Sequence, residues 1–114
     1  MAITRVKLSG STNGLGIGTL VTGAPTTIHT STTAANTSDE VHIWFANMSS
    51  STVTTTIYFG ATGHPVPIEV PPGVGPYLAI PGFFLTGGLV VSARVETAAN
   101  MLAYGFVNRL TTGA

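Results

Sequence analysis

The segments EVHIWFAN (residues 40–47) and TVTTTIYF (residues 52–59) decide the fold class of this chain, because apolar side chains recur in both at every second position. In the first segment, Val41, Ile43 and Phe45 share one face. A period of two is that of a half-buried β-strand, whereas a helix repeats every 3.6 residues. A polar stretch of about five residues separates the two segments, so the pattern predicts an antiparallel hairpin.

The same alternation extends through the rest of the chain, where turns rich in glycine and proline separate short apolar segments and no stretch shows the period of a helix. Strands at such spacing, with turns between them, predict an all-β fold: an antiparallel β-sandwich that is jelly-roll-like. The further segments with this alternation are residues 66–70, 77–80, 89–96 and 101–110.

Three local features refine this prediction. Pro67 cannot donate a hydrogen bond to a ladder, so we expect residues 66–70 to form an edge strand. Pro81-Gly82 is expected to end the run that begins at Tyr77, and residues 97–100 to close a second hairpin. The last segment, residues 101–110, is apolar on both faces, which places it in the centre of a sheet or against a neighbouring subunit.

The first part of the chain differs from the remainder in composition. Residues 1–38 are rich in Gly, Ser, Thr and Ala, with few apolar residues to bury. Such a segment gains too little from burial to fold alone, and strand addition onto a neighbour is one way to order it. The sequence therefore predicts an extended N-terminal arm with one or two edge strands in residues 1–38, followed by a β-sandwich domain in residues 39–114.

The charge content limits the kinds of partner. Of the 114 residues only 7% are charged, with four basic and four acidic residues and a net charge of zero. A nucleic-acid-binding protein needs clustered Lys and Arg, and a membrane span needs an apolar run of ~18 residues, so neither partner is expected. The start of the chain does not resemble a secretory signal, which favours a soluble protein made in the cytosol. A surface so poor in charge is weakly protected against association, and we expect self-association as a homotrimer.

Catalytic and metal-binding patterns are weak. The sequence has no cysteine, no His-Glu-x-x-His and no Gly-x-Ser-x-Gly. Its histidines, His29, His42 and His64, do not show the spacing of metal ligands. We therefore expect no enzymatic activity, no cofactor and no metal site.

Trp44 is the strongest candidate for a binding residue, because it lies on the strand face opposite the predicted core, which would normally be polar. With Tyr58 on the strand expected beside it, Trp44 fits a satellite core, a carbohydrate-stacking platform or a subunit contact. Glycan platforms usually add acidic and amide partners, which are few here, so we favour a subunit contact. His42, on the same face, and Arg109, in the last strand, complete the predicted interface.

Residues 41–112 resemble a family of small virion proteins of tailed bacteriophages. The last of the matching segments is the most characteristic, and none of them carries an active site. The segments are VHIWFAN (41–47), IYFG (57–60), VPP (70–72), IPG (80–82), GGLVVSA (87–93) and GFVNRLT (105–111).

The resemblance implies a β-sandwich subunit of the virion, made in the cytoplasm of the host bacterium. We expect a decoration, or cement, protein that binds the major capsid protein or another virion protein on the outer capsid surface. Two other classes stay open. One is a tail, neck or fibre-base component or another host-attachment module, and the other is a soluble glycan-binding domain.

Overall fold

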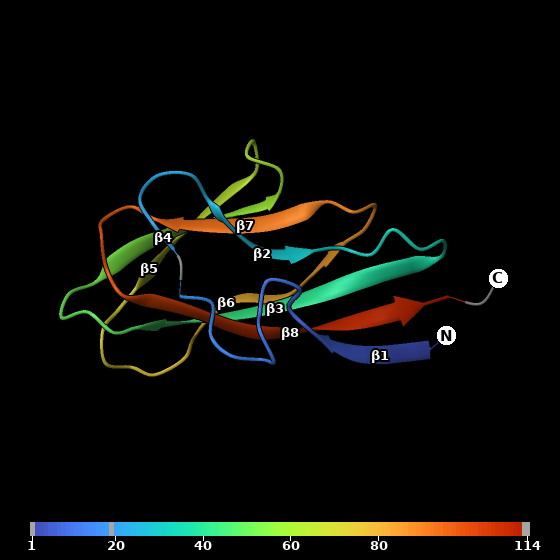
Figure 1. The fold of residues 1–114 in the computed structure, drawn as a ribbon, viewed down its shortest axis with the longest axis horizontal. Coiled ribbons are helices and arrows are strands. Elements are labelled where there is room, and N and C mark those ends of the chain that lie inside the picture. The colour runs from blue at the N-terminus through green and yellow to red at the C-terminus, as the bar shows by residue number, and fades with distance from the viewer. Residues whose placement is uncertain (1, 19, 113–114) are drawn as a thin grey trace.

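The fold is a sandwich of two antiparallel sheets, as a computed structural model of residues 2–18 and 20–112 shows (Figure 1). Sheet A has the strand order β1-β8-β3-β6 and sheet B the order β2-β7-β4-β5. The prediction of an all-β antiparallel β-sandwich is therefore confirmed. The strands are β1 (Ala2–Lys7), β2 (Thr26–Thr30), β3 (Thr37–Asn47), β4 (Val53–Gly60), β5 (Pro65–Val70), β6 (Tyr77–Leu85), β7 (Val90–Val95) and β8 (Met101–Thr111).

The core lies between the two sheets and follows the period of two. Val41, Ile43 and Phe45 are completely buried on the inner face of β3, as their alternation predicts. From sheet B, Ile57 of β4 and Val91 of β7 meet them with no exposed surface. Burial of each such side chain stabilises the fold by about 1.5–3 kcal/mol, so this layer holds the two sheets together.

The predicted hairpin between the first two segments is wrong, because β3 belongs to sheet A and β4 to sheet B. Both strands have one apolar face, and these faces are buried against each other across the ~10 Å between the sheets. The side-chain amide of Asn47 fixes the corner by donating to the carbonyl oxygens of Ser51 (2.9 Å) and Val70 (2.8 Å). The predicted hairpin at residues 97–100 is wrong for the same reason, since β7 and β8 lie in different sheets.

The strand order pairs the first strand with the last. β1 pairs with β8, β2 with β7, β3 with β6 and β4 with β5, so the chain follows the path of one long hairpin wound into two layers. Among the eight described strands, only β4 and β5 are both neighbours in sequence and partners in a sheet. The predictions that the proline-containing strand β5 lies at an edge and that β8 lies centrally are confirmed.

The strand β6 does not end at Pro81-Gly82 as expected. It continues to Leu85, and its register against β3 shifts at this point and again near Ala79. Gly82 has a φ of 105°, which an L side chain rarely adopts, so glycine lets the strand absorb an extra residue as a bulge.

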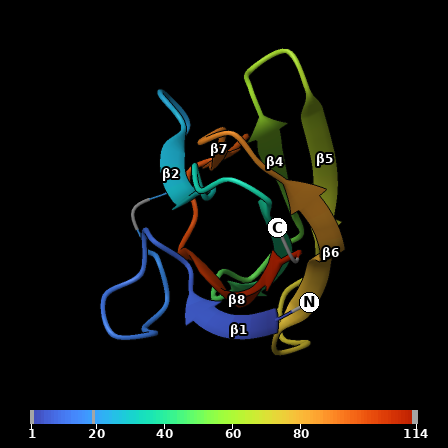
Figure 2. The ribbon, with the colours of Figure 1, turned by 90° about the vertical axis from the view of Figure 1, so that its right-hand side faces the viewer.

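The structure does not confirm an extended N-terminal arm. β1 pairs with β8 from Ala2↔Thr111 to Lys7↔Phe106, and the chain between β1 and β2 lies along one side of the sandwich (Figure 2). Leu8 and Ile28 are completely buried in the core, and Ile17 exchanges two backbone hydrogen bonds with Ala103. A few well-placed apolar residues thus integrate a segment whose average composition is polar, and the predicted boundary at residues 38/39 falls inside β3.

One buried polar group gives a test of the core. Thr55 lies on the inner face of β4 with no exposed surface, and within the described residues its hydroxyl has no hydrogen-bond partner. We expect Thr55→Val to raise the free energy of unfolding by about 1 kcal/mol, because a buried unpaired hydroxyl costs about 1–3 kcal/mol. Thermal unfolding should show a melting temperature higher by about 4 °C, whereas Thr54→Val on the outer face should change it little. A lower melting temperature for Thr55→Val would show that the hydroxyl is paired.

Candidate interaction surface

The outer faces of the two sheets differ in chemistry. The outer face of sheet B is mainly polar: Thr56 donates to Glu96 (2.7 Å), and Arg94 pairs with the same carboxylate (3.3 Å). The outer face of sheet A instead carries His42 and Trp44 from β3 and Tyr104 and Phe106 from β8. We call this surface the aromatic face. It is the candidate interaction surface, because an outward sheet face is normally polar.

The rings of the aromatic face pack side by side. The centroid of the Phe106 ring lies 4.7 Å from that of His42, with an interplanar angle of 19°, and 5.8 Å from that of Trp44. The guanidinium carbon of Arg5, on β1, lies 4.6 Å from the Phe106 centroid, in a cation–π contact. Phe106 is thus in ring or cation contact with three neighbours, and the exposed Leu78 and Phe84 of β6 flank the cluster.

A row of polar side chains crosses the same face. Arg5 Nε donates to Asn108 Oδ1 (3.3 Å), Asn108 Nδ2 donates to Glu40 Oε1 (3.1 Å), and His42 Nε2 lies 2.7 Å from Glu40 Oε1. The hydrogen bond from His42, followed by that from Asn108, lowers the pKa of Glu40 below its ordinary value. Three strands of sheet A are therefore linked on the surface as well as through the ladder.

This arrangement favours contact with a protein surface over stacking of a sugar ring. A sugar needs an open aromatic face, whereas the rings of Phe106, His42 and Trp44 lie against one another. Glu40 and Asn108 supply the acid and the amide that glycan sites use, but they hydrogen-bond to each other. The surface thus combines exposed apolar edges with a row of hydrogen-bonded polar side chains, and protein interfaces combine an apolar centre with a polar rim.

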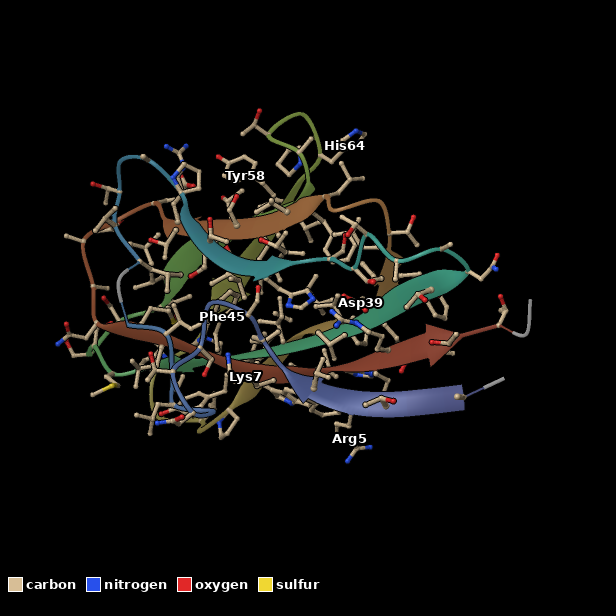
Figure 3. The ribbon with its side chains drawn as sticks, turned by 45° about the vertical axis from the view of Figure 1, so that its right-hand side comes forward. Arg5, Lys7, Asp39, Phe45, Tyr58 and His64 are labelled. Carbon is tan, nitrogen blue, oxygen red and sulfur yellow. The ribbon has the colours of Figure 1, made fainter. Side chains whose placement is uncertain are left out.

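The structure separates two residues that were predicted to meet. Trp44 and His42 lie together on the outer face of sheet A, but Tyr58 lies on β4 in sheet B. Because the inner neighbours of Trp44 and Tyr58 are buried against each other, the two rings point to opposite sides of the sandwich. Figure 3 shows this separation, with Arg5 projecting beyond β1 at the bottom and Tyr58 beyond sheet B at the top. Phe106 and Arg5 were missed, since their place beside His42 depends on strand pairing.

Arg109 is 35% exposed and pairs with a buried carboxylate. Its Nε donates to Asp39 Oδ1 (2.8 Å) and its Nη2 to Oδ2 (3.1 Å), at the inner face of sheet A. The Asp39 carboxylate is completely buried and also accepts from the backbone N–H of Thr32 (3.0 Å). The hydrogen bond with Asp39 raises the pKa of Arg109. Arg109 therefore holds a buried anion in place, and a second chain is not needed to pair it.

His29 completes this buried network from the other sheet. Its Nε2 lies 2.8 Å from Asp39 Oδ2, and its Nδ1 accepts the backbone N–H of Ser9 at 3.0 Å. An amide can only donate, so Nδ1 carries no proton and the proton of the neutral ring is on Nε2. Both nitrogens are occupied in a ring that is 1% exposed, so the pair has no free nitrogen to offer a substrate.

Other kinds of site find little support in the described residues. In that part of the chain no group of three or more His, Asp or Glu side chains is arranged to hold a metal ion, and no helix is long and apolar enough to cross a membrane. Comparison with known protein families, with curated proteins and with solved structures finds no match for this chain.

The buried network predicts a loss of stability in acid. Burial of the Asp39 carboxylate raises its pKa, but hydrogen bonds from Arg109, His29 and Thr32, with the charge of Arg109, outweigh this and lower the pKa below its ordinary value. A depressed pKa stabilises the folded state above the unfolded pKa, and this contribution is lost as the pH falls through the folded pKa. Melting temperatures measured from pH 7 to pH 2 should therefore fall below about pH 4.

The matched variant is Asp39→Asn. It should lower the free energy of unfolding at pH 7 by about 3 kcal/mol, because it leaves Arg109 without its anion. Its melting temperature should then depend less on pH in the acid range than that of the natural chain. If the melting temperature of Asp39→Asn falls as steeply in acid as that of the natural chain, groups other than Asp39 cause the loss of stability.

Proposed function

We propose that this chain is a non-enzymatic structural protein of a tailed bacteriophage, a decoration or cement protein that binds the outer capsid surface and stabilises the particle. Its partner would be the major capsid protein or another virion protein, and its place the capsid surface after synthesis in the host cytoplasm. The observation that carries the proposal is the contrast between the aromatic face of sheet A and the polar outer face of sheet B.

The contrast matters because a free monomer has no need of such a face. Trp, Tyr and Arg are the residues that contribute most to protein interfaces, and Trp44, Tyr104 and Arg5 are gathered here on one sheet. Within the polar row, Arg5 Nε, Asn108 and Glu40 Oε1 already hydrogen-bond to one another, which lowers the cost of covering these atoms. A face of this kind fits a flat protein surface such as a capsid.

The resemblance to phage virion proteins and the strand order supply independent support. The matching segments lie on β3, β4, β7 and β8, on the bulge of β6 and at the end of β5, so they include the strands that form the aromatic face. The two-layer wound hairpin resembles the connectivity of an eight-stranded jelly roll, an architecture that viral capsid and lectin domains use. Fold likeness alone does not fix a function, so this support is an analogy.

Two rival functions share some of this support. A tail, neck or fibre-base component would use the same face but would occur in few copies. A host-attachment module that binds glycans is favoured only by Glu40 and Asn108 beside the rings. Gel densitometry of purified particles should show hundreds of copies for a decoration protein, and a glycan array with the isolated chain should show no binding.

A pair of substitutions tests the aromatic face directly. Trp44→Ala removes a large ring from the proposed contact, and truncation of such a residue typically costs ~2 kcal/mol or more of binding, about a thirtyfold loss of affinity. Binding of the purified variant to particles that lack the protein should weaken by this factor, while circular dichroism should still show β-structure.

The control is Tyr58→Ala, which removes a partly exposed ring from the outer face of sheet B. It should leave binding to particles unchanged, since the proposal gives that face no partner. Equal binding losses in Trp44→Ala and Tyr58→Ala, or full binding by Trp44→Ala, would contradict the assignment of the aromatic face as the contact.

A further inference from the structure

The four edges of the two sheets are not alike. β1 carries Arg5 and Lys7, β2 has only five residues and a register shift, and β5 contains Pro65 and Pro67. Charges, short length and prolines are the features by which edge strands avoid pairing with other chains. β6 differs from them in length and charge, because it has nine residues and no charged side chain, although Pro81 and two bulges interrupt its backbone edge. Figure 2 shows β6 on the side of the sandwich opposite the chain that joins β1 to β2.

The edge at β6 exposes four large apolar side chains. Phe84 is 59% exposed, Leu78 48%, Phe83 45% and Tyr77 37%. A fully exposed large side chain has about 200 Å² of accessible surface, so the four exposed fractions correspond to roughly 400 Å² of exposed side-chain area. That is about half of the ~800 Å² that each partner buries in a standard interface, before the backbone and the neighbouring Val74 are added.

The chemistry of this edge fits a copy of itself. Among its exposed large apolar side chains, Tyr77 and Leu78 precede Pro81, and Phe83 and Phe84 follow it. A second copy of β6 that runs antiparallel presents the same side chains to the first. Because neither strand has a charged side chain, the two strands do not repel each other. A charged partner would find no group to pair with. The bulges near Ala79 and Gly82 disturb the backbone ladder, so side chains would make the contact.

We propose that two copies of this chain associate through their β6 edges, antiparallel and about a two-fold axis, with Phe84 of each copy packing near Leu78 of the other. Both residues lie on the outer side of sheet A, opposite Glu40 and Trp44 of β3. A two-fold axis perpendicular to the sheets keeps the outer sides of both copies facing the same way. The contact does not depend on what the aromatic face binds, and it gives a dimer in place of the trimer expected from composition.

The test uses the isolated chain, without particles. Sedimentation equilibrium at micromolar to hundred-micromolar concentration should show a species of twice 11.6 kDa. Phe84→Lys places a charge where the proposal has an apolar contact, and it should raise the dimer dissociation constant by about tenfold or more. Leu78→Lys should do the same. Circular dichroism checks that each variant is folded, as the exposure of both positions leads us to expect.

The control is Ile3→Lys, at a residue that is 64% exposed and lies on the outer side of sheet A at the opposite edge, on β1. It should leave the dimer unchanged. A monomer at all concentrations, a trimer, or a dimer that survives both Phe84→Lys and Leu78→Lys would overturn the proposal. None of these outcomes bears on particle binding by Trp44→Ala, so the proposed function is tested separately.

Discussion

The buried carboxylate of Asp39 is the interaction on which the rest of the sandwich depends. An unpaired carboxylate cannot be removed from water without a cost of several kcal/mol, so its partners must be in place when the sheets close. Those partners come from β8 (Arg109), from β2 (His29) and from the turn at Thr32. Because His29 in turn accepts the N–H of Ser9, one anion fixes both sheets and the chain that follows β1.

The period of two connects this buried network to the surface. Asp39 points into the sandwich, so Glu40 points out, where it hydrogen-bonds with His42 and Asn108. The same strand continues with Val41 and Ile43 inside and Trp44 outside. The position of the aromatic face is therefore a consequence of the inner face, since a shift of one residue in β3 would exchange the two.

The sequence predicts the parts of this structure that depend on a single strand. The inward positions of β3, the edge position of β5 and the central position of β8 follow from alternation, from proline and from apolar content. The placement of β3 and β4 in different sheets could not be predicted, because a five-residue connection can close a hairpin or cross between sheets equally well. The wrong prediction that Tyr58 lies beside Trp44 follows from the wrongly predicted hairpin. The inward position of Arg109 could have been predicted from alternation. Arg109 lies an even number of positions from the buried residues Met101, Ala103 and Val107, so it shares their face of the strand.

The Asp39 network could not be found in the sequence, because His29 lies in a segment without a clear pattern and meets Asp39 only through the path of the chain. The hydrophobic residues before β3 were missed for a related reason. Leu8, Ile17 and Ile28 are separated by long runs of Gly, Ser and Thr, and an average over that segment hides them. Composition describes how much a segment can bury, but not where its few apolar residues are placed.

The pairing of the first strand with the last also sets the order in which the molecule can form. β3 lies between β6 and β8, and β1 has only β8 as a partner in sheet A, with Ala2 opposite Thr111. During synthesis the apolar inner face of β3 is therefore made long before β8, which completes its sheet. Folds dominated by such distant contacts form slowly, and their incomplete chains expose surfaces that aggregate. A ribosome that stalls before residue 101 leaves a chain without β8, so β1 and the inner strand β3 lack the strand that joins them in sheet A.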